Sequence, residues 1–228
     1  MIEYNDSVKK GRSAIASTPL HLALLAIAIG SGPAPLPAQL GARSASEWIK
    51  NLERDSRTAE LKIDEVIARI GLRPGDLVAD LGAGTGIFTR PFARAVSPSG
   101  KAYAVEIDRE LVEHIDRRAH EEGIRNLETV LGQTDDPNLP VRDLDVAFFH
   151  DVLHHIKERE LYLKRLAAYL KPSGRIVVID LLHGHEKEPE MQITLDDVTR
   201  WMDAAGFQPI QRISLFKDKF FVIYGRKL

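Results

Sequence analysis

The seven-residue stretch Asp80–Gly86 constrains the fold of this chain more than any other part. It reads D-L-G-A-G-T-G and directly follows the apolar run Leu77–Ala79. It therefore predicts a buried strand, a glycine-packed turn and a helix that begins at Ile87. The glycines lack the Cβ atoms that would keep a ligand away from the backbone, and the N–H groups at the start of the helix can bind an anionic group. This combination indicates a site for a nucleotide-like cofactor.

The spacing of the glycines indicates which kind of cofactor. The dinucleotide pattern G-x-G-x-x-G needs a glycine at position 87, where this chain has Ile87. The pattern D-x-G-x-G-x-G and the segments around it instead resemble the class I S-adenosylmethionine-dependent methyltransferases. The resemblance runs from about Trp48 to the C-terminus and is closest to the small-molecule branch that includes the ubiquinone and menaquinone biosynthesis enzymes. A set of bacterial relatives also has the run L-G-Q-T-D-D-P-N-L-P found here at 131–140. The resemblance implies S-adenosyl-L-methionine as the cofactor.

Composition narrows the class of protein. The 228 residues are 44% hydrophobic and 28% charged, which is typical of one globular domain with a single core. The formal net charge is −2 and no basic stripe is visible, so a small-molecule substrate is expected rather than nucleic acid. The chain has no cysteine, which excludes disulfides, thiolate metal sites and a cysteine nucleophile. The oligomeric state stays open.

The N-terminal segment differs from the rest. A basic start is followed by Ser13–Ala42, which has no charged side chain, and Leu22–Ile29 within it is wholly apolar. This is typical of a secretory signal or a membrane anchor, although the apolar part is short for a span of about 20 residues. We therefore divide the chain into a leader, 1–42, and a methyltransferase domain, 43–228. Because the methyl donor is made in the cytosol, we expect a cytoplasmic protein, with membrane contact or export through the leader left open.

From Arg43 onward, strand-like and helix-like segments alternate. This order predicts an α/β fold with a doubly wound, mostly parallel, seven-stranded Rossmann-like sheet. The last two strands read as an antiparallel hairpin around the charged residues 217–219, as the resemblance also implies. The predicted strands are 77–81, 102–107, 127–131, 144–149, 176–179, 210–216 and 220–224. The predicted helices are 63–70, 88–95, the segment from the Asp108 cap to Gly123, a stripe ending at Leu170, and 194–206.

The cofactor residues are expected at the carboxyl ends of the first two strands, where such sheets bind ligands. By the resemblance, the glycine loop wraps the methionine and ribose portions, and Asp80 faces the methionine amino group. Glu106 ends the second strand and aligns with the acid that accepts hydrogen bonds from both ribose hydroxyls. Ile107 aligns with the apolar residue against the adenine. The loop residues are Gly82, Ala83, Gly84 and Gly86.

The turn after the third strand supplies acceptors where the family recognises the adenine amino group. Asp135 is favoured for this role, with Asp136 as the second candidate. A solvated turn explains the same residues without any ligand.

The segment after the fourth strand is the place to look for groups near the transferred methyl. Methyl transfer from a sulfonium is an in-line displacement, so alignment can supply much of the acceleration without a catalytic acid or base. The candidate catalytic residues are Asp151, His150 and His154, with His150 also lining the cofactor. Asp151 is expected near the sulfonium rather than as a base. His155 more simply holds the loop by a backbone hydrogen bond.

A second polar group follows the fifth strand and invites a metal hypothesis. Asp180 together with Asp151 resembles the acids of catechol-type methyltransferases, but those enzymes place an amide ligand where this chain has Leu181. No metal is therefore predicted, and the residues read as a lid loop over the acceptor. The further members of this group are His183, His185, Glu186, Glu188 and Glu190.

The function that these features favour is methyl transfer to a small or lipid-like acceptor. Two alternatives stay open: a Rossmann-type NAD(P)-dependent oxidoreductase and a non-catalytic module that only binds the cofactor. Neither the acceptor nor the methylated atom follows from the residues. Trp48 is expected to cover the acceptor site or to pack in the core.

Overall fold

The structure is a computed structural model that describes residues 44–182 and 191–227. The expected leader, 1–42, and the polar group from His183 to Glu190 lie outside the described residues. Within the described ranges, none of the helices has the length and apolar character that crossing a membrane requires.

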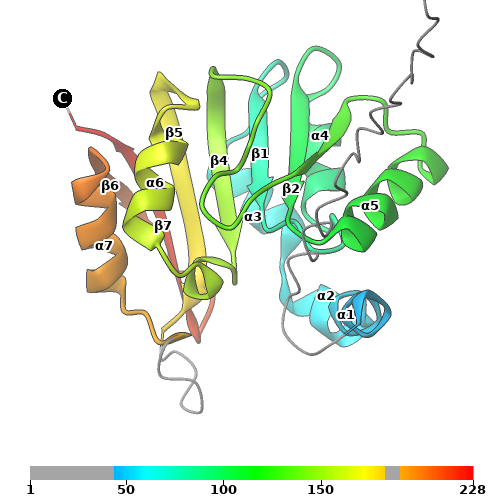
Figure 1. Ribbon diagram of the computed structural model, residues 1–228, viewed down its shortest axis with the longest axis horizontal. Helices are drawn as coiled ribbons and strands as arrows, with labels where there is room; N and C mark the ends of the chain where they lie inside the picture. Colours follow the sequence, from blue (N-terminus) through cyan, green and yellow to red (C-terminus); the bar gives the residue numbers. More distant parts are fainter. Residues whose placement is uncertain (1–43, 183–190, 228) are drawn as a thin grey trace, which may run out of the picture. The chain divides into compact units, whose positions relative to one another are not determined.

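One seven-stranded sheet organises the described residues, in the order β3-β2-β1-β4-β5-β7-β6 (Figure 1). The strands from β3 to β5 pair in parallel, and β7 pairs antiparallel with both β5 and β6. This arrangement confirms the predicted doubly wound fold with its antiparallel end. The strands are β1 (Leu77–Leu81), β2 (Lys101–Glu106), β3 (Leu127–Leu131), β4 (Leu144–His150), β5 (Leu170–Leu181), β6 (Phe207–Arg212) and β7 (Lys219–Arg226).

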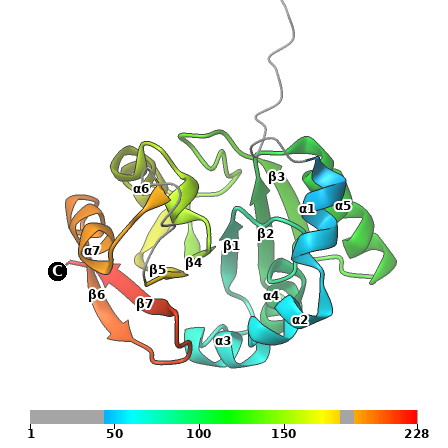
Figure 2. The same cartoon turned by 90° about the horizontal axis from the view of Figure 1, so that it is seen from below.

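Helices cover both faces of the sheet because its strands are apolar on both sides. Val78 and Val146 point into one core cluster with helices α3 and α4, whereas Ala79 and Phe149 point into the other with α6 and α7 (Figure 2). Helix α5 packs on β2 and β3. The helices are α1 (Ala45–Leu52), α2 (Asp55–Glu60), α3 (Ile63–Ile70), α4 (Thr89–Val96), α5 (Arg109–Glu121), α6 (Arg159–Ala167) and α7 (Leu195–Ala204), with a 3₁₀ turn η1 (Leu153–His155).

The helix ends follow from capping chemistry. Asp108 accepts hydrogen bonds from the backbone N–H groups of Glu110 and Leu111, which confirms it as the N-cap of α5. Gly71 ends α3 in the left-handed conformation. Thr194 and Asp197 form a capping box at the start of α7. These caps place the helices at the positions that the sequence indicates.

Strand β5 begins earlier than predicted. The sequence interpretation assigned Leu170 to the preceding helix and 171–174 to its closing turn, whereas the structure has α6 end at Ala167 and β5 begin at Leu170. Leu170 is in register with Leu144 of β4, and a register shift lies between Leu144 and Val146. The irregular pairing accommodates Pro172, which lacks a backbone N–H for a regular ladder.

Strand β6 also lies elsewhere than predicted, at Phe207–Arg212 instead of 210–216. Its pairing with β7 runs from Phe207–Arg226 to Arg212–Val222 and is interrupted by a shift at Pro209. The apolar residues Ile213, Leu215 and Phe216 leave the sheet and pack against the core cluster on the α3–α4 side. Their hydrophobicity reflects this packing rather than a strand.

Candidate active site

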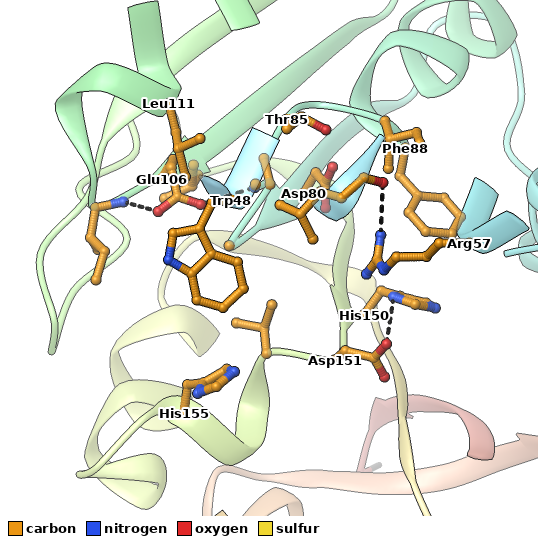
Figure 3. Close-up of a pocket in the computed structure, with 18 residues that line it drawn as sticks. Trp48, Arg57, Asp80, Thr85, Phe88, Glu106, Leu111, His150, Asp151 and His155 are labelled. Carbon is orange, nitrogen blue, oxygen red and sulfur yellow. Dashed lines mark hydrogen bonds and ion pairs between the residues drawn. The ribbon is translucent and has the colours of Figure 1, made fainter. Parts of the chain in front are cut away.

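A cavity lies at the carboxyl ends of β1, β2 and β4, where the order of the sheet reverses (Figure 3). Its enclosed volume is about 150 Å³, and it opens to solvent. The residues that line it are Trp48, Leu52, Arg57, Asp80, Gly82, Ala83, Gly84, Thr85, Ile87, Phe88, Val105, Glu106, Ile107, Leu111, His150, Asp151, Val152 and His155.

The loop after β1 follows a path that only glycine allows. Gly82, Gly84 and Gly86 have φ angles of +71°, +58° and +71°, in the region that L side chains rarely adopt. A Cβ on Gly82 would lie 2.6 Å from the Val152 methyl carbons, and one on Gly86 would lie 3.1 Å from Ile115. Gly82 and Gly84 line the cavity, whereas Gly86 packs the loop on α5 and is not part of the lining.

Glu106 connects the end of β2 to this loop. Its Oε2 accepts a hydrogen bond from the Gly84 N–H at 2.9 Å, and its Oε1 accepts one from the Ile107 N–H at 2.7 Å. Burial raises the pKa of Glu106, and these backbone donors oppose that change. The carboxyl group is thus fixed on the cavity wall with lone pairs left for a ligand hydroxyl.

Asp80 lies at the base of the same cavity. Its Oδ2 accepts a hydrogen bond from the Thr89 hydroxyl at 2.5 Å, and burial raises its pKa to about 7. Thr85 lies on the wall nearby, and its buried Oγ1 has no hydrogen-bond partner within the described residues. A buried carboxyl and an unpaired hydroxyl are groups that a polar ligand can satisfy.

His150 ends β4 in an aromatic environment. Its ring centroid lies 4.9 Å from that of Phe88, and burial lowers its pKa to about 4. The Nδ1 atom lies 3.4 Å from Asp151 Oδ2, while the Nε2 atom is buried without a hydrogen-bond partner in the described part of the chain. His150 is therefore neutral near pH 7 and a weak proton acceptor.

Asp151 follows with φ at +55°, a conformation that Asp tolerates better than most residues. The Lys219 Nζ atom donates to its Oδ1 at 2.5 Å and also to its Oδ2. Burial alone would raise the pKa of Asp151, but His150 and Lys219 lower it. Asp151 is thus an ionised carboxylate at the cavity edge with its charge already paired.

The helices α1 and α2 contribute side chains to the cavity lining, among them Trp48 and Arg57 (Figure 3). Trp48 and Leu52 come from α1, and Arg57 comes from α2 with its Nη1 donating to the Leu52 carbonyl at 3.3 Å. Burial lowers the pKa of Arg57 and the nearby Asp151 opposes this, so the guanidinium remains a cation inside the cavity. Sequence reasoning named Trp48 but missed Arg57, because a single arginine on a six-residue helix has no distinguishing pattern.

The structure brings most of the predicted cofactor residues together on one cavity wall. Asp80, Glu106, Ile107, His150 and Asp151 all line it, with the loop residues 82–84. Their roles toward a ligand remain predictions.

Asp135 and Asp136 do not reach the cavity. The Asp135 carboxylate pairs with Arg165 of α6, and Asp136 accepts a hydrogen bond from the Tyr169 hydroxyl at 2.7 Å. In this structure the turn after β3 faces α6 and its polar groups are paired there, so a role of either acid toward adenine stays a prediction.

His154 is also placed differently from the expectation. It lies in η1, buried and outside the cavity lining, with its Nδ1 2.7 Å from Asp180 Oδ1. The neighbouring His155 lines the cavity instead. Adjacent residues of a 3₁₀ turn point in different directions, so only one of the pair can face the ligand. Within the described ranges, no three His, Cys, Asp or Glu side chains are grouped to hold a metal ion.

Comparison with known proteins finds similar domains among the methyltransferases. Residues 78–174, which span β1 to the first part of β5, match the model of a methyltransferase domain. A ubiquinone/menaquinone biosynthesis C-methyltransferase from Ectopseudomonas mendocina is 30% identical over 111 residues, covering 48% of this chain and 43% of that protein. These matches support a class I S-adenosylmethionine-dependent methyltransferase.

The solved structures agree with the methyltransferase fold. A SAM-dependent methyltransferase from Aquifex aeolicus superposes with a TM-score of 0.72 at 24% identity and covers 80% of this chain and 98% of that one. A structure titled as a [4+2]-cyclase, SpnF, has a TM-score of 0.59 at 20% identity and covers 68% of this chain and 59% of that one. At these identities the likeness concerns the fold. The chain spans less than half the length of the first curated relatives that it matches.

The residues present fit the cofactor of this methyltransferase family. The left-handed path at Gly82 leaves room that a Cβ would fill, the buried Thr85 hydroxyl lacks a partner, and Glu106 ends β2 on the cavity wall. S-adenosylmethionine carries a hydroxylated sugar, a carboxylate and two cationic centres, and the cavity offers carboxylates and one guanidinium to match them.

Proposed function

We propose that this chain transfers the methyl group of S-adenosylmethionine to a small, apolar acceptor. The observation that carries the proposal is the cavity at the switch point of the sheet, with the glycine loop on one side and Glu106 and Asp80 at its base. The match of residues 78–174 to a methyltransferase domain supports the same reaction.

In this proposal each part of the cofactor binds a side chain of matching chemistry. Glu106 accepts the ribose hydroxyls and Ile107 packs on the adenine, because Glu106 ends β2 beside the glycine loop and Ile107 directly follows it. Asp80 takes the methionine amino group, and Arg57 takes its carboxylate, since Arg57 is a half-buried cation that lines this cavity. Bound in this way, the cofactor supplies an activated methyl group on a sulfonium.

The chain itself contributes by aligning the two reactants in a site that excludes water. Trp48 and Leu52 of α1 line the cavity, and Val152 and His155 line it after β4. His150 is neutral and Asp151 is paired with Lys219, so neither side chain is available as a strong base. Rate acceleration then comes mainly from holding the acceptor in line with the methyl group and excluding water.

The acceptor that we propose is a hydrophobic ring compound such as a quinol. The lining is rich in apolar and aromatic side chains: Trp48, Leu52, Phe88, Leu111 and Val152. Support also comes from relatives near 30% identity that are named ubiquinone/menaquinone biosynthesis C-methyltransferases.

Two measurements test this function. Isothermal titration calorimetry should detect binding of S-adenosylmethionine and S-adenosylhomocysteine, with no heat from NADH. Transfer of a labelled methyl group to a short-chain quinol, and not to a polar amine of similar size, would then support the acceptor class. Binding of NADH alone would favour an oxidoreductase, and binding of the donor without transfer to any acceptor in a cell extract would favour a non-catalytic module.

A further inference from the structure

A partly buried ion pair joins the cavity to the C-terminal strands. Asp151 follows β4 and lines the cavity, while Lys219 begins β7 and lies outside the lining. The Lys219 Nζ atom contacts both oxygens of the Asp151 carboxylate, and the two side chains are only 15% and 22% exposed. Pairing of this kind is stronger than at the surface, because little water screens it.

The sheet fixes the position of Lys219. It is in register with Leu181 at the end of β5, and the Leu182 N–H donates to the Asp218 carbonyl at 2.8 Å. Phe216, three residues earlier, packs its ring edge against His150 at 6.4 Å. The segment before β7 is therefore held against the same end of β4 that carries Asp151.

The other ionisable groups around Asp151 do not replace Lys219. His150 lies 3.4 Å away but is neutral near pH 7, because burial lowers its pKa to about 4. Arg57 attracts Asp151 electrostatically, while its Nη1 atom donates a hydrogen bond to the Leu52 carbonyl. Removal of the lysine ammonium would leave Asp151 without the cation that donates hydrogen bonds to its carboxylate.

Charge at this edge matters for the reaction proposed above, on which this inference rests. The methyl donor has a positively charged sulfur, and the product S-adenosylhomocysteine has a neutral one. An unpaired carboxylate on the cavity wall stabilises the charged donor more than the product. It would thus tighten ground-state binding without a matching gain in the transition state, where the charge is leaving the sulfur.

We propose that Lys219 is a charge-balancing and positioning residue of the active site. By pairing with Asp151 it keeps this edge of the cavity close to electrical neutrality, and so limits the preference of the site for the cationic donor over its product. Lys219 acts through Asp151 and does not itself touch the ligand.

The test compares the dissociation constants of S-adenosylmethionine and S-adenosylhomocysteine in full-length variants. In Lys219→Met, the ratio of product to donor dissociation constants should rise about tenfold or more, because Asp151 becomes an unpaired anion. In Asp151→Asn it should fall, because Lys219 is then the unpaired charge. The double variant should return towards the wild-type ratio. Lys217→Met, an exposed lysine on the same loop, is the matched control and should leave the ratio unchanged.

Different results would refute the role of Lys219 and the proposed methyltransferase function. If Lys219→Met folds and weakens both ligands equally, the lysine has only a structural role and the inference is wrong. If Lys219→Met does not fold, an unchanged ratio in Asp151→Asn would overturn it. A wild-type protein that binds neither ligand would refute the proposed function, and the inference would fall with it.

Discussion

The Oε2 atom of Glu106 accepts a hydrogen bond from the backbone N–H of Gly84 at 2.9 Å. This contact ties the end of β2 to the centre of the glycine loop, two segments that are separated by a complete helix. It places an acidic oxygen and a backbone without a side chain at the same point of the cavity wall. The glycine loop and Glu106 are therefore expected to bind the cofactor together.

Glu106→Gln tests whether Glu106 binds the cofactor. The amide keeps the size of the side chain but replaces one acceptor oxygen with a donor, so a ribose hydroxyl and the Gly84 N–H lose partners. We expect S-adenosylhomocysteine affinity to fall by about 1.5–3 kcal/mol, measured by calorimetric titration. Glu110→Gln, an exposed acid on α5, makes the same charge change away from the cavity and should have no effect. Equal affinities of wild type and Glu106→Gln would refute the assignment.

Gly82→Ala should destabilise the fold and weaken cofactor binding. The new Cβ costs about 1–2 kcal/mol for the left-handed backbone and would also lie 2.6 Å from Val152. Gly71→Ala is a matched control, because Gly71 has a similar φ of +68° with no atom within 4 Å of the added Cβ. Chemical denaturation should therefore show a larger loss of unfolding free energy for Gly82→Ala. Equal losses would mean that the contact with Val152 is relieved without cost.

The pKa of Asp80 predicts how stability changes with pH. Burial raises it from 3.8 to about 7, so the folded state holds a proton that the unfolded state has released. The stabilisation from this proton is complete below about pH 3.8 and is lost as the pH rises through 7.

Between pH 5 and pH 8 the wild type should therefore lose about 2–3 kcal/mol more unfolding free energy than Asp80→Asn. Urea denaturation without cofactor at the two pH values measures this difference. Parallel pH profiles of the two proteins would show that Asp80 is ionised in the fold throughout this range.

Asp135→Ala should leave S-adenosylhomocysteine affinity within about twofold of the wild type. The sequence interpretation favours Asp135 as the adenine acceptor, but its carboxylate pairs with Arg165 outside the cavity lining. That exposed pair contributes little to stability, so the variant should also unfold near the wild-type temperature. A large loss of affinity in calorimetry would show that the turn after β3 moves to meet the ligand.

The parts of the fold that the sequence predicted well have strong local signals. Strands β1 and β3 match their predicted ranges, β2 differs by one residue at each end and β4 by one residue at its end, because each is a short apolar run bounded by turn residues. The ends of β5 and β6 were placed wrongly. Leu170 fits a helical stripe as well as a strand, and Ile213–Phe216 is apolar because it covers the core.

The residues of the candidate site also fall into those that the sequence indicated and those that it did not. Asp80 and Glu106 were found because each ends a strand next to the glycine loop, and strand order places such residues together. Arg57 and Lys219 were not found, because their significance arises only when α2 and β7 fold against the end of β4. His154 lies outside the cavity lining and contacts Asp180, a position that residue type alone does not indicate, because it says nothing about which way a 3₁₀ turn faces.

Strand β7 occupies an inner position of the sheet although it is the last of the seven strands in the sequence. During synthesis, the edge of β5 therefore stays without a neighbour until residues 219–226 have left the ribosome, and a nascent chain cut before them would present that bare edge to other chains. The first residue of this late strand is the lysine that neutralises Asp151. The protein thus acquires the final charge state of its cavity only once translation has passed the whole sheet.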